Sequence, residues 1–199
     1  MAPTYPKQIT VKSGERVDLR PLTSSDMQAL IDFFAGLPAE STQFLKHNVR
    51  DAEVVRGFLK SDPSSIWAIV AVTADGNIVG DATLHMTQLG WRRHVGEVRV
   101  VVATAYQKQG LATQLIHELV NQASLKGLRK LKAEILDSQT GARQAFVRLG
   151  FIEEARLKQH ALSSDGQLHD IVILTNTVDD LWKKMEDLIC DMEYSPDTY

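Results

Sequence analysis

The chain has 199 residues, of which 44% are hydrophobic and 24% charged, an ordinary composition for a globular protein with a substantial core. Its 22 basic and 25 acidic residues give a net charge of −3, which argues against a general nucleic-acid binder. The single cysteine, Cys190, excludes an intrachain disulfide, and no apolar run reaches the roughly 20 residues of a membrane span. We therefore expect a cytoplasmic protein with no membrane or nucleic-acid partner, folded as one domain over residues 1–199.

The N-terminal part of the chain predicts a strand followed by two helices. Residues 17–20 alternate in polarity, as a half-buried strand does. Residues 24–26 read Ser-Ser-Asp, a helix start signal, and the apolar residues after them share one helical face until Pro38. A second helical pattern over residues 54–59 ends before Pro63.

Three strands are predicted next. Residues 66–72 form a nearly continuous apolar run that is short enough for a buried strand. Residues 75–77 read Asp-Gly-Asn, a turn signal, so the run at 78–84 should return as the second strand of an antiparallel hairpin. A polar loop around residues 90–94 then leads into a third strand over residues 97–102.

The C-terminal half predicts two further helices among strands. A long helix starts near residue 111 and ends at Gly127, a typical end-cap residue. A strand over residues 131–135 follows, and then a short helix that stops at Gly150. Two more strands, one from residue 151 and one over residues 170–174, are joined by a turn at residues 164–166 and complete the expected sheet.

The last predicted helix, over residues 176–193, has the cleanest amphipathic pattern. Its apolar stripe consists of Val178, Leu181, Trp182, Met185, Leu188, Ile189 and Met192. We expect this stripe to pack on its own domain, with the interface of a homodimer as the alternative. Cys190 is expected to be a packed or partly buried thiol of this helix, and residues 194–199 a loose tail.

The segment that carries chemistry joins the strand at 97–102 to the long helix. A small-residue loop at a helix start lets backbone N–H groups approach an anion, and the helix dipole adds partial positive charge. Here Gly110 and Ala112 remove side-chain bulk, and Thr113 adds a hydroxyl. No Gly-Lys-Ser/Thr sequence closes the segment and no three-glycine fingerprint is present, so it is neither a P-loop nor a Rossmann motif.

The same segment carries a family resemblance. Gln107-Lys108-Gln109-Gly110-Leu111-Ala112 matches the Gln/Arg-x-x-Gly-x-Gly/Ala signature of the GNAT superfamily of N-acetyltransferases. The preceding Val100-Val101-Val102 resembles that family's central strand, and the helix from Ala142 through Phe146 to Leu149-Gly150-Phe151 is similar to its second motif. The opening residues 17–22 resemble a branch that includes bacterial protein-lysine acetyltransferase domains.

The resemblance covers residues 16–175 and implies an α+β fold. In this fold a central, mixed but mostly antiparallel sheet is flanked by helices, and the C-terminal helix is an addition to it. The implied co-substrate is acetyl-coenzyme A, with no metal, and the implied reaction is direct attack of a primary amine on the thioester. The implied cofactor-binding residues are Val100, Val101, Val102, Gln107, Lys108, Gln109, Gly110, Leu111, Ala112, Thr113, Gln139, Ala142 and Phe146.

Within this resemblance, Glu97 is the candidate general base, because it begins the central strand as catalytic carboxylates do in several members. The alternative is an ordinary solvated or ion-paired strand residue, and Glu134 is a weaker candidate. The family's oxyanion donor is a backbone N–H near Val102. Phe146 lacks the hydroxyl of the tyrosine that protonates the leaving thiolate in many members, so the general acid stays open.

Two functions remain after this reading. The first is an active N-acetyltransferase, whose acceptor is either a small molecule or a protein amine. The second is a non-catalytic acyl-coenzyme A-binding domain with a sensing or scaffold role. The missing tyrosine favours this second function. The six histidines show no metal-ligand spacing, so we expect them to be structural or surface residues.

Overall fold

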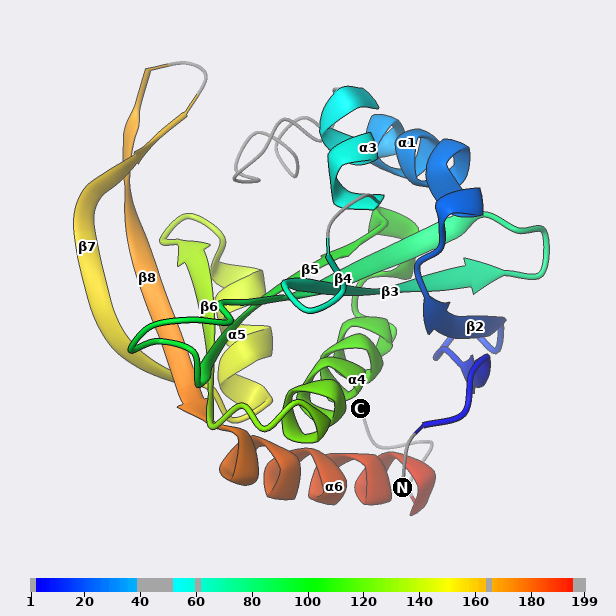
Figure 1. The fold of residues 1–199 in the computed structure, drawn as a ribbon. Coiled ribbons are helices and arrows are strands. Elements are labelled where there is room, and N and C mark those ends of the chain that lie inside the picture. The colour runs from blue at the N-terminus through cyan, green and yellow to red at the C-terminus, as the bar shows by residue number, and fades with distance from the viewer. Residues whose placement is uncertain (1–2, 39–51, 60–61, 164–165, 195–199) are drawn as a thin grey trace.

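The computed structural model describes residues 3–38, 52–59, 62–163 and 166–194, and its centre is an eight-stranded sheet in the order β1-β2-β3-β4-β5-β6-β8-β7 (Figure 1). The strands are β1 Lys7–Thr10, β2 Arg16–Pro21, β3 Ile66–Thr73, β4 Ile78–Met86, β5 Val95–Val102, β6 Lys130–Leu136, β7 Ile152–Leu162 and β8 Leu168–Thr177. All neighbouring strands pair antiparallel except β5 and β6, which are parallel. The expected mixed α+β fold is confirmed.

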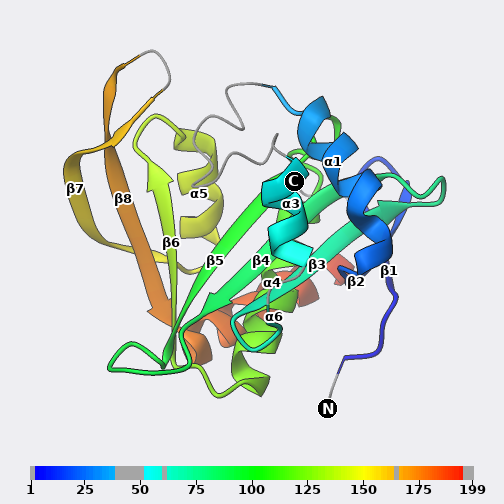
Figure 2. The ribbon, with the colours of Figure 1, turned by 45° about the horizontal axis from the view of Figure 1, so that its top comes forward.

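Helices cover both faces of this sheet (Figures 1 and 2). The helical elements are η1 Ser24–Asp26, α1 Met27–Gly36, α3 Ala52–Leu59, η2 Thr104–Tyr106, α4 Leu111–Leu125, α5 Thr140–Arg148 and α6 Val178–Tyr194. Buried residues of α1 and α3 form one apolar cluster with Val70, Val72 and Ile78 of the sheet. Buried residues of α4, α5 and α6 form a larger cluster on the other face. The two faces therefore have separate cores.

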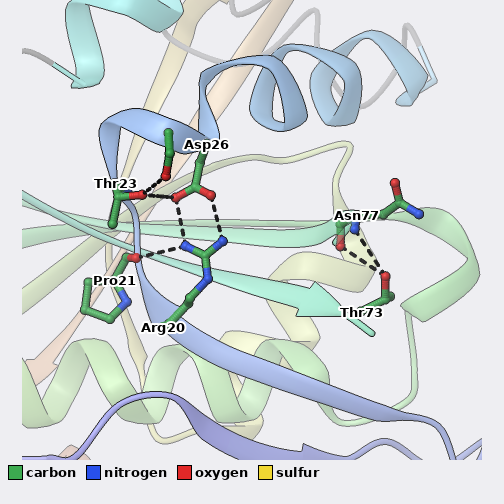
Figure 3. A network of polar contacts seen from close by, with 7 residues as sticks. Arg20, Pro21, Thr23, Asp26, Thr73 and Asn77 are labelled. Atoms are coloured by element: carbon green, nitrogen blue, oxygen red, sulfur yellow. Dashed lines mark hydrogen bonds and ion pairs between the residues drawn. The ribbon is translucent and has the colours of Figure 1, made fainter. Parts of the chain in front are cut away.

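A polar network anchors the start of α1 over the sheet (Figure 3). The Arg20 guanidinium of β2 donates to both carboxylate oxygens of Asp26, at 2.6 and 2.8 Å. The backbone N–H and the hydroxyl of Thr23 also donate to Asp26, at 2.8 and 2.7 Å. The hydrogen bonds from Arg20 outweigh burial and lower the pKa of Asp26 to about 2. The network ties the helix entry to the sheet through an ionised carboxylate.

Helix α6 packs within its own chain, next to α4. Val178, Leu181 and Met185 of the predicted stripe are buried in the core that α4 shares. The α4 helix ends as expected, because Gly127 adopts φ +70° and its N–H bonds the Ser124 carbonyl at 3.0 Å. The side chains beyond Leu188, including Cys190, and the tail after Tyr194 lie outside the described residues.

Every strand and helix predicted above is present, but the sequence analysis missed β1. This strand pairs antiparallel with β2 from Lys7↔Leu19 to Thr10↔Arg16. The turn between them contains Gly14 at φ +87°, a conformation that favours glycine. The predicted turn at residues 164–166 falls partly outside the described residues.

Candidate functional site

The parallel strands β5 and β6 pair over a short distance and then separate. Their register runs from Val95↔Lys130 to Glu97↔Lys132, three residue pairs in all. Strand β5 continues to Val102 and β6 to Leu136, so beyond Glu97 the two strands diverge (Figure 2). An opening in the middle of the sheet results, and its edges are strand backbones.

The backbone of β5 presents hydrogen-bonding groups to this opening. The Ala103 N–H donates to the carbonyl of Val79 in β4 at 2.9 Å. Because alternate residues of an antiparallel strand bond to the same neighbour, the N–H and carbonyl groups of Val100 and Val102 point away from β4 and toward β6. The side-chain amide of Gln107 donates to the Val102 carbonyl at 3.2 Å, which ties the following loop to the strand end. An extended ligand with amide groups can pair with this edge.

The loop after β5 ends in a glycine that starts α4. Gly110 is the N-cap at φ +85°, and Lys108 before it is also left-handed, at φ +59°. A Cβ at Gly110 would meet no atom within 4 Å, so the backbone conformation rather than crowding requires glycine. Among the described residues, no side chain caps this helix start, and the N–H of Gln114 bonds the Gly110 carbonyl at 3.2 Å. The N–H groups of residues 111–113 therefore lie at an uncapped, partially positive helix end.

The turn between β1 and β2 contacts this loop, a juxtaposition the sequence analysis did not foresee. The Lys12 N–H donates to the Gln109 carbonyl at 3.3 Å, and the Ser13 N–H to the Gln109 side chain at 3.4 Å. Tyr106 donates its hydroxyl to Glu15 at 3.0 Å. The turn brings Lys12, a cation, next to the candidate phosphate loop. Gly14 between two alternating segments is the sequence signal that could have predicted the hairpin.

Glu97 lies where the strands separate, within a cluster of alternating charges. Its Oε1 accepts from Arg99 at 3.0 and 3.1 Å, and its Oε2 lies 3.0 Å from the Lys132 ammonium. Lys132 also contacts Glu134 at 2.6 Å. Burial opposes the charge of Lys132, but the hydrogen bonds with Glu134 and Glu97 outweigh it and raise the pKa of Lys132.

This cluster bears on the role expected for Glu97. The Glu97 side chain is 18% exposed, so it is partly withdrawn from water as expected for a general base. Two cations nevertheless contact its oxygens, and their charge favours the ionised carboxylate. The structure thus shows the ion-paired strand residue that was the alternative to a base, and the candidate Glu134 is held by the same lysine.

The residues expected from α5 divide into two groups. Gln139 is the N-cap of α5 and accepts the Leu136 N–H through its side chain at 3.3 Å, while Ala142 is exposed. Phe146 is buried and packs edge-on against Phe151, with ring centroids 5.0 Å apart. Phe146 therefore packs in the core on this face of the sheet. The end of β6 and the start of α5 place Gln139 next to the opening.

A carboxyl group that the sequence analysis overlooked lies on β4. Asp81 is 8% exposed, and the described residues offer it no hydrogen bond or ion pair. Burial raises the pKa of Asp81 to about 7. Its register neighbours are Val70 of β3 and Val101 of β5, both of the apolar cluster under α1 and α3. In the sequence the only signal is an acidic residue inside an apolar strand.

Two other kinds of site were sought. Within the described ranges, no group of three His, Cys, Asp or Glu side chains could hold a metal ion, and no helix there could cross a bilayer. A hollow of about 700 Å³ is lined by Trp91, Arg93, His94 and Lys126, among others. These residues belong to the loops before β5 and after α4, so the hollow lies at the opposite end of α4 from Gly110.

Residues 29–151, more than half of the chain, match the acetyltransferase (GNAT) family. The chain belongs to this family. Membership implies the use of an acyl-coenzyme A and an amine acceptor. The structure fits such a ligand, because the backbone edge of β5 leads directly to the uncapped start of α4, and this helix start can receive the pyrophosphate.

Solved structures of GNAT proteins share the fold. The GNAT domain of S. lividans PAT superposes with a TM-score of 0.72 at 20% identity, over 89% of this chain and 99% of that one. An acetyltransferase of the GNAT family from Streptococcus pneumoniae gives 0.67 at 19%, over 81% and 99%. The ribosomal-protein-S5-alanine acetyltransferase from Vibrio fischeri gives 0.69 at 17%, over 83% and 94%. At these identities the likeness concerns the fold alone.

Proposed function

We propose that this GNAT protein is an N-acetyltransferase that moves an acetyl group from acetyl-coenzyme A to a primary amine by direct attack. The observation that carries the proposal is the continuity of the site. The opening between β5 and β6 exposes the backbone of Val100 and Val102, and the same strand leads to the glycine-initiated start of α4. One extended ligand with amides at one end and phosphates at the other would use both features.

Different parts of the site would bind different parts of acetyl-coenzyme A. N–H groups of residues 108–113 would hold the pyrophosphate, and Lys12 and Lys108 add positive charge nearby. Backbone groups of Val100 and Val102 would pair with the amides of the pantetheine arm, and a β5 N–H near Val102 would stabilise the developing oxyanion. When bound, acetyl-coenzyme A supplies an activated acyl thioester.

The acceptor must lose a proton before it attacks, because an alkyl amine with a pKa of about 10.4 is mostly protonated at neutral pH. Glu97 is the proton acceptor that the sequence nominates. Its exchange for glutamine keeps the shape but removes the basic oxygen, and loss of a general base typically lowers turnover by about 10²–10⁴-fold. Glu134→Gln is the comparison variant, because Glu134 is the weaker candidate base and shares the contact with Lys132 from the next strand.

The test combines calorimetric titration with coenzyme A and turnover of acetyl-coenzyme A on a panel of small amines and peptides. We expect binding by wild type and by both variants, and turnover by wild type. Cys190→Ser should keep full turnover, because direct attack needs no acyl-cysteine and the chain has no other cysteine. Binding of coenzyme A without turnover on any amine would instead favour the non-catalytic acyl-coenzyme A-binding domain. The ion pairs of Glu97 are the observation that supports this alternative.

A further inference from the structure

The hollow between the loop that precedes β5 and the loop that follows α4 is cationic. Its volume of about 700 Å³ is that of a small-molecule site. Its lining includes Arg93, His94, Lys126 and Arg129, and every described residue that lines it is neutral or basic. The whole chain has a net charge of −3, so this concentration of cations is local. The hollow therefore favours an anionic ligand.

Backbone hydrogen bonds hold the walls of the hollow together. The His94 carbonyl accepts from the N–H groups of Arg129 and Lys130, at 2.9 and 3.2 Å, and so joins the two loops. The Met86 N–H donates to the Ser65 carbonyl at 2.7 Å, which joins the end of β4 to the turn before β3. Because the lining side chains project from this fixed frame, a ligand has less of the protein to order when it binds.

Three side chains of the hollow carry charges that are in no ion pair with a described acid. The Arg93 guanidinium donates to the Gly90 carbonyl at 3.2 Å, and the Lys126 ammonium to the Pro63 carbonyl at 3.5 Å. Arg129 has no side-chain hydrogen bond or ion pair with the described residues. The helix dipole accounts for cations at the C-terminal end of α4, where Lys126 and Arg129 lie, but not for Arg93 on the other loop.

Asp62 is an acid beside this cluster, and its carboxylate is already bound. It accepts from the Ser64 hydroxyl and N–H at 2.6 and 2.8 Å. These hydrogen bonds, with a smaller effect of Lys126, lower the pKa of Asp62. Asp62 does not line the hollow, so it leaves Arg93 and Arg129 as charges that a ligand can neutralise.

Trp91 supplies a flat aromatic surface to the same hollow. It is 87% exposed and lines the hollow. The other two tryptophans, Trp67 and Trp182, are in ring contacts with Tyr5 and His117, whose centroids lie 6.4 and 5.3 Å away. An exposed indole is a stacking surface for a planar ring. The hollow therefore combines features that suit an anion with a ring.

The hollow is separate from the candidate coenzyme A site. Gly110 precedes the first residue of α4, and Lys126 follows the last. The 15 residues of this helix, at about 1.5 Å each, separate the two by about 22 Å. Phosphates held at the start of α4 therefore do not contact the hollow at its end.

We propose that the hollow binds a nucleotide, with the base stacked on Trp91 and the phosphates bound by Arg93, Lys126 and Arg129. Arginine pairs with phosphate oxygens through two parallel N–H bonds, and lysine supplies a point charge. The imidazole of His94 adds a further donor. Inorganic phosphate would leave most of the hollow unfilled, and a carboxylate-rich peptide would bring no ring to Trp91.

Calorimetric titration of the full chain with ADP tests the proposal, with inorganic pyrophosphate as the ligand that lacks a base. We expect pyrophosphate to bind about 5–150-fold more weakly than ADP, because it has nothing to stack on Trp91. Raising the salt concentration from about 0.05 M to about 0.5 M should weaken the binding of both, because salt screens exposed charges. Gly110→Ala, which alters the phosphate loop, should leave ADP binding at the hollow unchanged.

Two pairs of residues on one loop provide matched variants. Trp91 and Arg93 line the hollow, whereas Leu89 and Arg92 are exposed on the same loop and do not line it. Trp91→Ala should weaken ADP binding by about 5–150-fold and leave pyrophosphate binding unchanged. Arg93→Ala should weaken the binding of both ligands by about 10–150-fold. Leu89→Ala and Arg92→Ala should bind ADP as wild type does, and circular dichroism checks that every variant is folded.

ADP binding that is weakened by Trp91→Ala and Arg93→Ala, but not by Leu89→Ala and Arg92→Ala, supports the proposal. A wild type that does not bind ADP overturns it, and so do equal ADP affinities of Arg93→Ala and Arg92→Ala. Equal affinities of wild type for pyrophosphate and ADP would also overturn it, because Trp91 would then play no part. An oligo-aspartate peptide that binds where ADP does not would overturn it in favour of an acidic protein segment.

Discussion

Asp81 makes a prediction about stability that is independent of any substrate. Its pKa rises from the ordinary 3.8 to about 7 in the folded protein because of burial. The folded state therefore binds the proton more tightly than the unfolded chain does, and stability falls as pH rises from about 4 to about 7. At about 1.4 kcal/mol per pH unit, the ionised carboxyl lowers the free energy of unfolding by about 4 kcal/mol at pH 8 and by about 1.5 kcal/mol at pH 5.

Replacement of Asp81 by asparagine removes the titration and keeps the shape of the side chain. The difference in unfolding free energy between variant and wild type should therefore grow by about 2.5 kcal/mol in favour of the variant from pH 5 to pH 8. Urea denaturation followed by circular dichroism at a series of pH values measures this difference. Asp18→Asn on β2 is the control for the substitution itself, since Asp18 is also a strand aspartate but is only partly buried.

An Asp81→Asn difference that stays constant across this range would refute the reasoning, because Asp81 would then titrate alike in the folded and unfolded chains.

Three further predictions concern the loop, the helix entry and α6. Gly110→Ala and Gly127→Ala should each lower the free energy of unfolding by about 1 kcal/mol, since both glycines have positive φ. Only Gly110→Ala should weaken coenzyme A binding in calorimetry, and equal affinities of the two variants for coenzyme A would exclude the loop as the pyrophosphate site. Asp26→Asn should lower the free energy of unfolding, measured by urea denaturation, by about 2 kcal/mol at pH 7. This difference should vanish as pH falls from about 4 to about 2, where the wild-type carboxylate becomes protonated, and a difference that persists below pH 2 would mean that charge is not its source. Truncation after Thr177 exposes the surfaces that Val178, Leu181 and Met185 cover and should cost about 5 kcal/mol in thermal unfolding; an equally stable truncated protein would contradict the packing of α6.

The backbone conformation of the candidate phosphate loop could be predicted from the sequence, because it is set by a few adjacent residues. Gly110 is needed where the chain turns left-handed to start α4, and this requirement is set by a few adjacent residues. The family signature spans the same short segment. The packing of Phe146 could not be predicted from the sequence, because a phenylalanine at helical spacing suits a channel or a core equally well. Only the structure shows its edge-on contact with Phe151.

The sequence by itself determined the order and type of nearly all elements, because hydrophobic periodicity and turn residues act over a few positions. Only the tertiary structure decided which side chains meet across strands. Arg99 and Lys132 approach Glu97 from its own strand and from the neighbouring one, and Asp81 becomes a buried acid because β3, β5 and α1 enclose it. Strand register is set by contacts between distant segments, and the charge state of a carboxyl depends on what that register places beside it.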